Sequence, residues 1–167
     1  MKKLNLFYKT ITVILASALL LSGCGFKLRG SHYLPEVFKS LSVQSFDQHS
    51  ELTRLVKQQL IANDVTLTDS TTATQLRLIK DNLDRRTLTL FPNGQVAEYE
   101  LIYSVFYEVM IPGKEPQSFN FEIYRDYQDD PDKALAKSRE LNVILKEMRV
   151  QAANRVIRQL ASIKTTN

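Results

Sequence analysis

The only cysteine of the chain, Cys24, carries its single thiol, and its position points to chemistry on that sulfur. It follows an apolar run, Thr10 to Leu21, and a short start that contains lysines. This run is far shorter than the roughly 20 apolar residues that a membrane-spanning helix needs. A charged start, a short apolar run and small residues at its end are typical of a cleaved export signal. The sequence therefore predicts a signal peptide over residues 1–23.

The residues at the expected cleavage site, Leu21-Ser22-Gly23-Cys24, resemble the bacterial lipobox. In such signals the thiol accepts a diacylglycerol, the chain is cut before the cysteine, and the new amine is acylated. An ordinary signal with an incidental cysteine is the weaker interpretation, because an unpaired thiol is unusual in an exported chain. Stable anchoring takes more than one acyl chain, and this modification supplies three. Gly25 stands where lipoproteins of the inner membrane usually have Asp, so we expect anchoring in the outer membrane, on its periplasmic side.

Removing the signal changes the charge balance. Three of the 22 basic residues lie in residues 1–23, which leaves 19 against 18 acidic residues. A nearly neutral mature chain gives no support for nucleic-acid binding. The charges are unevenly distributed, since residues 87–132 hold two basic and nine acidic residues and residues 133–167 hold eight basic and two acidic. Two alternatives stay open: the segments attract each other within one fold, or the last one forms a basic face for a partner.

The mature chain is predicted to begin with a lipidated tether over residues 24–36, which contains glycines, polar residues and a proline. Residues 37–164 are long enough for one domain with its own core. Leu41 to Phe46 alternates apolar and polar residues and predicts a strand. The apolar spacing from Ser50 to about Asn63 predicts a helix capped by the serine. Val65 to Thr68 is a candidate short strand.

The centre of the chain predicts a β-meander of three long strands. They cover Gln75 to Phe91, Gln95 to Ile111 and Gln117 to Tyr127. Asn93-Gly94 between the first two is a strong hairpin signal and predicts a type I′ turn. Strands usually have about five or six residues, so we expect the tip Phe91-Pro92-Asn93-Gly94 to project beyond the core. A strongly twisted sheet with a solvated end is the alternative.

Asp130-Pro131 is expected to open the last helix, which runs to about Ala161 or Ser162, since proline and acidic residues favour a helix start. A stripe at helical spacing predicts its buried side: Leu141, Leu145, Met148, Ala152, Val156 and Leu160. The predicted fold class is α+β. It is a two-layer sandwich with two helices on a four-stranded, mostly antiparallel sheet that has long central hairpins.

Catalytic patterns are missing from the sequence. The two histidines, His32 and His49, lie in the tether and before a helix, without a recognisable partner. We find no glycine-rich phosphate loop and no spacing typical of metal ligands. The acidic residues of the central strands are interpreted as a solvated face. We therefore expect a protein that is not an enzyme and that needs no cofactor or metal.

Five short stretches resemble the family of the LPS-assembly lipoprotein LptE. They are Cys24-Gly25-Phe26-Lys27-Leu28-Arg29, Asn93-Gly94-Gln95-Val96-Ala97-Glu98-Tyr99, Ile111-Pro112-Gly113, Ala134-Leu135-Ala136-Lys137 and Lys146-Glu147-Met148. Their order and spacing extend over nearly the whole mature chain. The resemblance implies two helices on a four-stranded sheet, in agreement with the pattern above.

The resemblance also implies a function. The family plugs the large outer-membrane β-barrel LptD, assists its assembly, binds lipopolysaccharide and helps deliver it to the outer leaflet. Lys137 matches a family position associated with lipopolysaccharide. Pro92 stands where some relatives have a basic residue, so Arg85 and Arg86 are candidates to replace that cation, and the tip at residues 91–94 is a candidate partner contact. A periplasmic lipid-carrying lipoprotein and an accessory of barrel folding are the alternatives.

Replacement of Cys24 tests the lipid anchor. We expect Cys24→Ala to accumulate as an unprocessed precursor without acyl label, because no thiol remains to accept the diacylglycerol. Incorporation of labelled palmitate in growing cells measures this directly. A mutant that still incorporates the label would show that the assignment is wrong.

Overall fold

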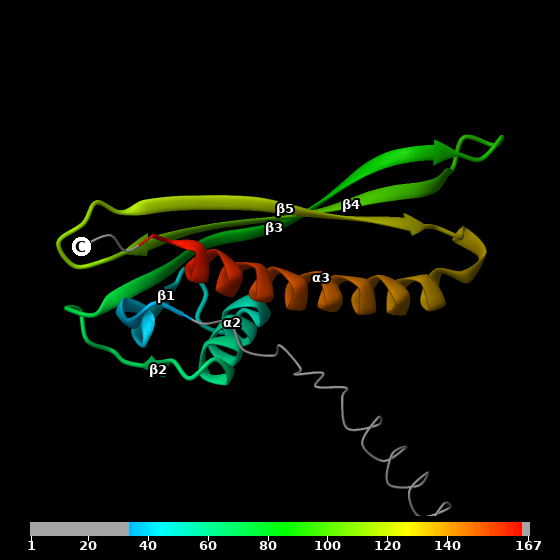
Figure 1. Cartoon of the computed structure of the whole chain (residues 1–167). Helices are drawn as coiled ribbons and strands as arrows, with labels where there is room; N and C mark the ends of the chain where they lie inside the picture. Colours follow the sequence, from blue (N-terminus) through cyan, green and yellow to red (C-terminus); the bar gives the residue numbers. More distant parts are fainter. Residues whose placement is uncertain (1–33, 165–167) are drawn as a thin grey trace, which may run out of the picture. The chain divides into compact units, whose positions relative to one another are not determined.

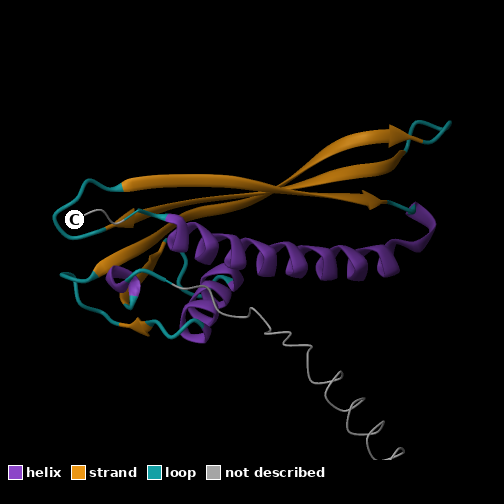
Figure 2. Ribbon diagram, in the orientation of Figure 1, coloured by secondary structure: helices purple, strands orange, loops and turns teal. Residues whose placement is uncertain are grey.

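The computed structural model describes residues 34–164, which form a five-stranded sheet with two α-helices on one face (Figures 1 and 2). The predicted signal peptide, Cys24 and the tether up to residue 33 lie outside the described residues. Within residues 34–164, neither helix combines the length and the apolar character needed to cross a membrane.

The first part of the domain is a small βαβ unit. Strand β1 (Ser40–Ser45), helix α2 (Glu51–Ala62) and the very short β2 (Thr66–Leu67) follow one another, and β1 pairs in parallel with β2. Helix α2 begins as predicted, because the Ser50 hydroxyl oxygen accepts a hydrogen bond from the Thr53 backbone N–H at 3.1 Å. This unit attaches to the long strands through parallel pairing of β1 with the next strand, β3.

The predicted meander is confirmed. Strands β3 (Thr74–Leu90), β4 (Val96–Met110) and β5 (Gln117–Gln128) are 17, 15 and 12 residues long and pair antiparallel. The order of the strands in the sheet is β2-β1-β3-β4-β5. The expected count of four strands is wrong by one, because β2 pairs with Ser40 and Leu41 of β1. A two-residue strand is defined by its hydrogen bonds to a neighbouring strand, because its sequence is too short to distinguish it from a loop.

The turn at the tip differs from the predicted type I′. Gly94 has a φ of +83°, whereas Asn93 does not take the positive φ that type I′ requires. The Gly94 N–H donates to the Phe91 carbonyl at 2.9 Å, and the Phe91 N–H donates to the Gln95 carbonyl at 2.8 Å. This is a three-residue loop of a type I turn followed by a left-handed glycine. The ring of Pro92 fixes φ near the value for the second position of a type I turn, which starts the turn one residue earlier.

The last helix, α3, covers Ala134–Ser162 and follows a short 3₁₀ turn at Pro131–Lys133, as the proline signal predicted. The second half of its predicted stripe is fully buried: Met148, Ala152, Val156 and Leu160. In the first half, Leu141 and Leu145 are only partly buried. The first half of the helix therefore extends beyond the buried core, along β5 (Figure 1).

The core lies between the helices and one face of the sheet, and it covers only the base of the long hairpin. On β4 the alternating residues Leu101, Tyr103, Val105, Tyr107 and Val109 are all buried. Toward the tip, Leu88 and Leu90 are 42% and 59% exposed. The tip thus extends beyond the core, as the length of the strands predicted (Figure 1).

Two buried tyrosines make the stability of this core sensitive to alkaline pH. Tyr107 stacks on Phe119 with 5.3 Å between ring centres, and its hydroxyl is buried without a hydrogen-bond partner in the described part of the chain. The Tyr103 hydroxyl donates to Asp81 at 2.5 Å. Burial raises the pKa of both hydroxyls, and the Asp81 bond raises that of Tyr103 further. Because both folded-state pKa values exceed the unfolded value of about 10, their contribution is complete below that pH and is lost as pH rises above it.

Phenylalanine substitutions separate the two tyrosines. We expect Tyr107→Phe to keep or increase the free energy of unfolding at neutral pH, because it removes an unsatisfied buried hydroxyl. It should also reduce the loss of stability at alkaline pH, because one titrating group is removed. Tyr103→Phe is the matched comparison and should cost about 1 kcal/mol, because it breaks the bond to Asp81. Urea unfolding followed by circular dichroism measures both. A larger loss for Tyr107→Phe than for Tyr103→Phe would contradict this account.

Candidate functional site

Two of the predicted site residues, Arg85 and Lys137, converge on a pair of tyrosines at the end of the core. Tyr99 of β4 and Tyr127 of β5 are direct cross-strand partners. The Arg85 guanidinium carbon lies 6.0 Å from the centre of the Tyr99 ring, and Lys137 Nζ lies 5.4 Å from that of Tyr127. Both distances are in the range of cation–π contacts. We call Arg85, Tyr99, Tyr127 and Lys137 the cation–tyrosine cluster.

Charges of both signs act on the Tyr127 hydroxyl. Burial and the charges of Asp129 and Glu140 raise its pKa, while the charges of Lys137 and Arg85 each act to lower it. The hydroxyl donates to the backbone carbonyl of Lys137 at 2.9 Å, which ties the start of α3 to the end of β5. Lys137 Nζ lies 2.9 Å from a Glu140 carboxylate oxygen, and its side chain is 19% exposed. A ligand anion would have to compete with Glu140 for this ammonium group.

Arg86, the third predicted cation, lies on the other face of the sheet. Arg85 pairs in register with the buried Leu101, whereas Arg86 pairs with Glu100. Arg86 Nη2 lies 2.6 Å from Glu100 Oε2, and that oxygen has no aligned hydrogen-bond donor among the described residues, so the contact is an ion pair. The structure does not bring Arg86 together with Lys137.

Exposed apolar side chains gather at the same end of the molecule as the cation–tyrosine cluster. Leu90 and Phe91 near the tip are 59% and 40% exposed, and Leu135 in the first turn of α3 is 81% exposed. The tip and the start of α3 lie at the same end of the sheet (Figure 1). Cations and exposed apolar side chains at one end of a domain suit an amphiphile that carries both phosphate groups and acyl chains.

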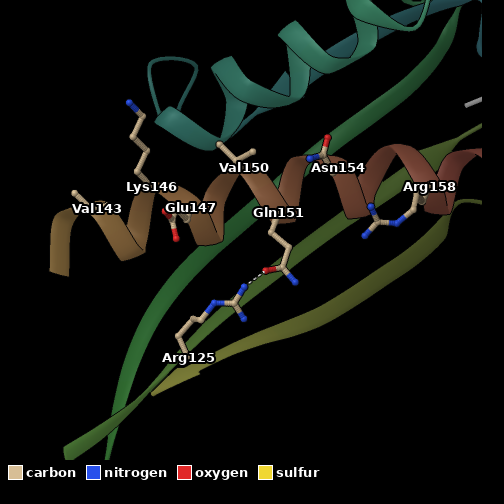
Figure 3. A pocket seen from close by; sticks show the side chains of 8 residues that line it. All are labelled: Arg125, Val143, Lys146, Glu147, Val150, Gln151, Asn154 and Arg158. Atoms are coloured by element: carbon tan, nitrogen blue, oxygen red, sulfur yellow. Dashed lines mark hydrogen bonds between the residues drawn. The ribbon is translucent and has the colours of Figure 1, made fainter. Parts of the chain in front are cut away.

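Sequence reasoning missed an open groove of about 540 Å³ between α3 and β5 (Figure 3). It is lined by Arg125, Val143, Lys146, Glu147, Val150, Gln151, Asn154 and Arg158. One signal was present, because Arg125 interrupts the apolar alternation of Phe119, Phe121 and Ile123 on β5. Only the fold shows that this arginine faces α3, where it donates to Gln151 Oε1 at 2.7 Å.

The sheet separates the carboxylates of β4 from the basic segment. Side chains of β4 that alternate with the buried ones, such as Glu100 and Glu108, lie on the face away from the helices. Among the described residues, the one ion pair between the two segments is the local pair Lys133–Asp130. Of the two alternatives for the charge pattern, the structure favours a basic face on α3. Residues 34–164 contain no group of acidic, histidine or cysteine side chains that could hold a metal ion.

A family model described as LptE, Lipopolysaccharide-assembly, matches residues 38–160. The chain belongs to the LptE family. It is 34% identical over 160 residues to the LPS-assembly lipoprotein LptE of Pectobacterium atrosepticum, covering 93% of this chain and 87% of the relative. It is 36% identical to that of Yersinia pestis, covering 93% and 77% of the two chains. The resemblance to the LptE family is confirmed.

Solved structures confirm the α+β fold class. The crystal structure of the rare lipoprotein B from Shewanella oneidensis is 54% identical, with a TM-score of 0.70, and the match covers 74% of this chain and 94% of the other. A solution structure of an uncharacterized lipoprotein B from Nitrosomonas europaea is 20% identical, with a TM-score of 0.67 over 83% and 91% of the two chains. The second match, at 20% identity, shows the fold alone.

Proposed function

We propose that this LPS-assembly lipoprotein is anchored through Cys24 to the periplasmic side of the outer membrane and plugs an LptD-like β-barrel. In that place it assists assembly of the barrel and helps deliver lipopolysaccharide to the outer leaflet, without acting as an enzyme. Family membership supports the general role. The observation that carries the lipopolysaccharide contact is the convergence of Arg85 and Lys137 on one tyrosine pair.

The cation–tyrosine cluster would bind phosphate groups of lipopolysaccharide. Arginine and lysine donate charge-assisted hydrogen bonds to phosphate oxygens, which are about twice as strong as neutral ones. The rings of Tyr99 and Tyr127 hold the two cations near each other before the ligand arrives, which lowers the cost of ordering them. The exposed Leu135 and Phe91 lie at the same end and would contact acyl chains.

The plug role fits the surface of the sheet. The lumen of a large barrel is polar and filled with water, and the face of the sheet away from the helices carries carboxylates such as Glu100 and Glu108. The tip at residues 91–94 extends past the core and is the proposed partner contact. A lipid carrier would need an apolar cavity, but the space between sheet and helices is filled by fully buried side chains such as Tyr103, Met148 and Ile157.

Charge removal at the cluster tests the lipopolysaccharide contact. We expect Lys137→Gln and Arg85→Gln each to reduce retention of lipopolysaccharide by the purified protein on the order of severalfold, because each removes a charge-assisted contact that solvent partly screens. Retention by the wild type should also weaken as salt rises. Pull-down with immobilised lipopolysaccharide measures both effects.

The structure offers matched controls for this test. Arg86→Gln removes the same charge from the neighbouring residue on the opposite face, and Lys164→Gln removes one beyond the end of α3. Both should retain lipopolysaccharide like the wild type. Equal losses in Arg85→Gln and Arg86→Gln would reveal a diffuse charge effect, and wild-type retention in all four variants would remove the cluster from the site.

A further inference from the structure

We propose that the groove between α3 and β5, the basic groove, binds an extended acidic polypeptide segment with aliphatic side chains. Its cations are Arg125, Lys146 and Arg158, and they lie around Val143 and Val150 (Figure 3). Val143 is 57% exposed. Glu147 also lines the groove, so three cations and one carboxylate surround an apolar floor.

The cations of the basic groove are free to receive a partner. In the described part of the chain, neither Arg125, Lys146 nor Arg158 forms an ion pair. Arg125 is held by bonds to Gln151 Oε1 at 2.7 Å and to the Tyr124 carbonyl at 3.0 Å, and its other N–H groups remain available. A guanidinium fixed in this way loses little freedom when it binds a carboxylate.

The spacing of the cations favours an extended chain over a lipid headgroup. From Lys146 to Arg158 the helix rises about 18 Å, at roughly 1.5 Å per residue. An extended segment of about five or six residues covers that length at roughly 3.3 Å per residue. A phosphate headgroup is compact and needs cations that converge on one point, as Arg85 and Lys137 do at the cluster. In the basic groove, Lys146 and Arg158 instead lie about three helical turns apart.

The segment would be recognised through its side chains, not by adding a strand to β5. This strand forms an edge of the sheet. Two of its carbonyls are already occupied, because Arg155 Nη1 donates to Glu122 O at 3.1 Å and Arg125 donates to Tyr124 O. The Arg155 guanidinium also lies 4.6 Å from the centre of the Phe121 ring. Arginines placed along an edge strand in this way hinder pairing with another chain.

The basic groove shares no residue with the cation–tyrosine cluster, so this inference goes beyond the proposed function and does not depend on it. The test uses the full chain purified in detergent and a fluorescein-labelled peptide of alternating Asp and Val residues. Fluorescence anisotropy should show saturable binding to the wild type. The double variant Lys146→Glu/Arg158→Glu should weaken binding on the order of tenfold or more, since two attractive contacts become repulsive.

Matched variants separate the groove from general charge and general hydrophobicity. Lys57→Glu/Lys164→Glu changes the net charge equally on residues outside the groove and should bind the peptide like the wild type. Val143→Ser should weaken binding severalfold through loss of the apolar floor, whereas Ile61→Ser, at an exposed position on α2 outside the groove, should not. Circular dichroism checks that each variant keeps its helix content.

Three results would overturn the proposal. The first is absence of saturable binding to the wild type, and the second is equal weakening by the two double charge variants. The third is displacement of the peptide by lipopolysaccharide together with loss of lipopolysaccharide retention in Lys146→Glu/Arg158→Glu, which would make the groove a lipid site. Loss of lipopolysaccharide retention in the Arg85 and Lys137 variants alone would support two separate sites.

Discussion

A β-bulge at Ile79 decides which side chains of β3 face the helices. Before it, Leu76 and Leu78 are buried in the core. The register with β4 shifts between Leu78 and Lys80, so the following residues change faces. As a result Arg85, and not Arg86, points to the side where α3 begins. Without this one extra residue, the cation–tyrosine cluster would lack one of its two cations.

The length of the strands is the second constraint. A sheet with arms of 17, 15 and 12 residues is longer than two helices and a small core can cover, even though α3 has 29 residues. The excess length carries exposed apolar side chains and cations, while the base of the hairpin is buried in the core. The base of the strands thus contributes stability, and the opposite end carries the side chains that we propose for ligand binding.

Local sequence signals predicted the elements well and their mutual placement only in part. The serine cap of α2, the proline at the start of the last helix and the alternation of β4 each act within a few residues, and all three are confirmed. The turn type was missed because Pro92 outweighs the Asn-Gly preference. Two features depend on residues far apart in the chain, so no local pattern predicts them. They are the 2.6 Å contact of Arg149 with Glu51 of α2 and the basic groove.

We propose that this family member works inside a β-barrel that transports lipopolysaccharide. Its most direct test is purification of the tagged full chain from outer membranes, with the bound proteins identified and their ratio to the chain measured. We expect one large β-barrel in an amount equal to the chain, which stays bound when the acyl anchor is extracted with detergent. Recovery of an inner-membrane transporter, or of several folding factors in varying amounts, would contradict it.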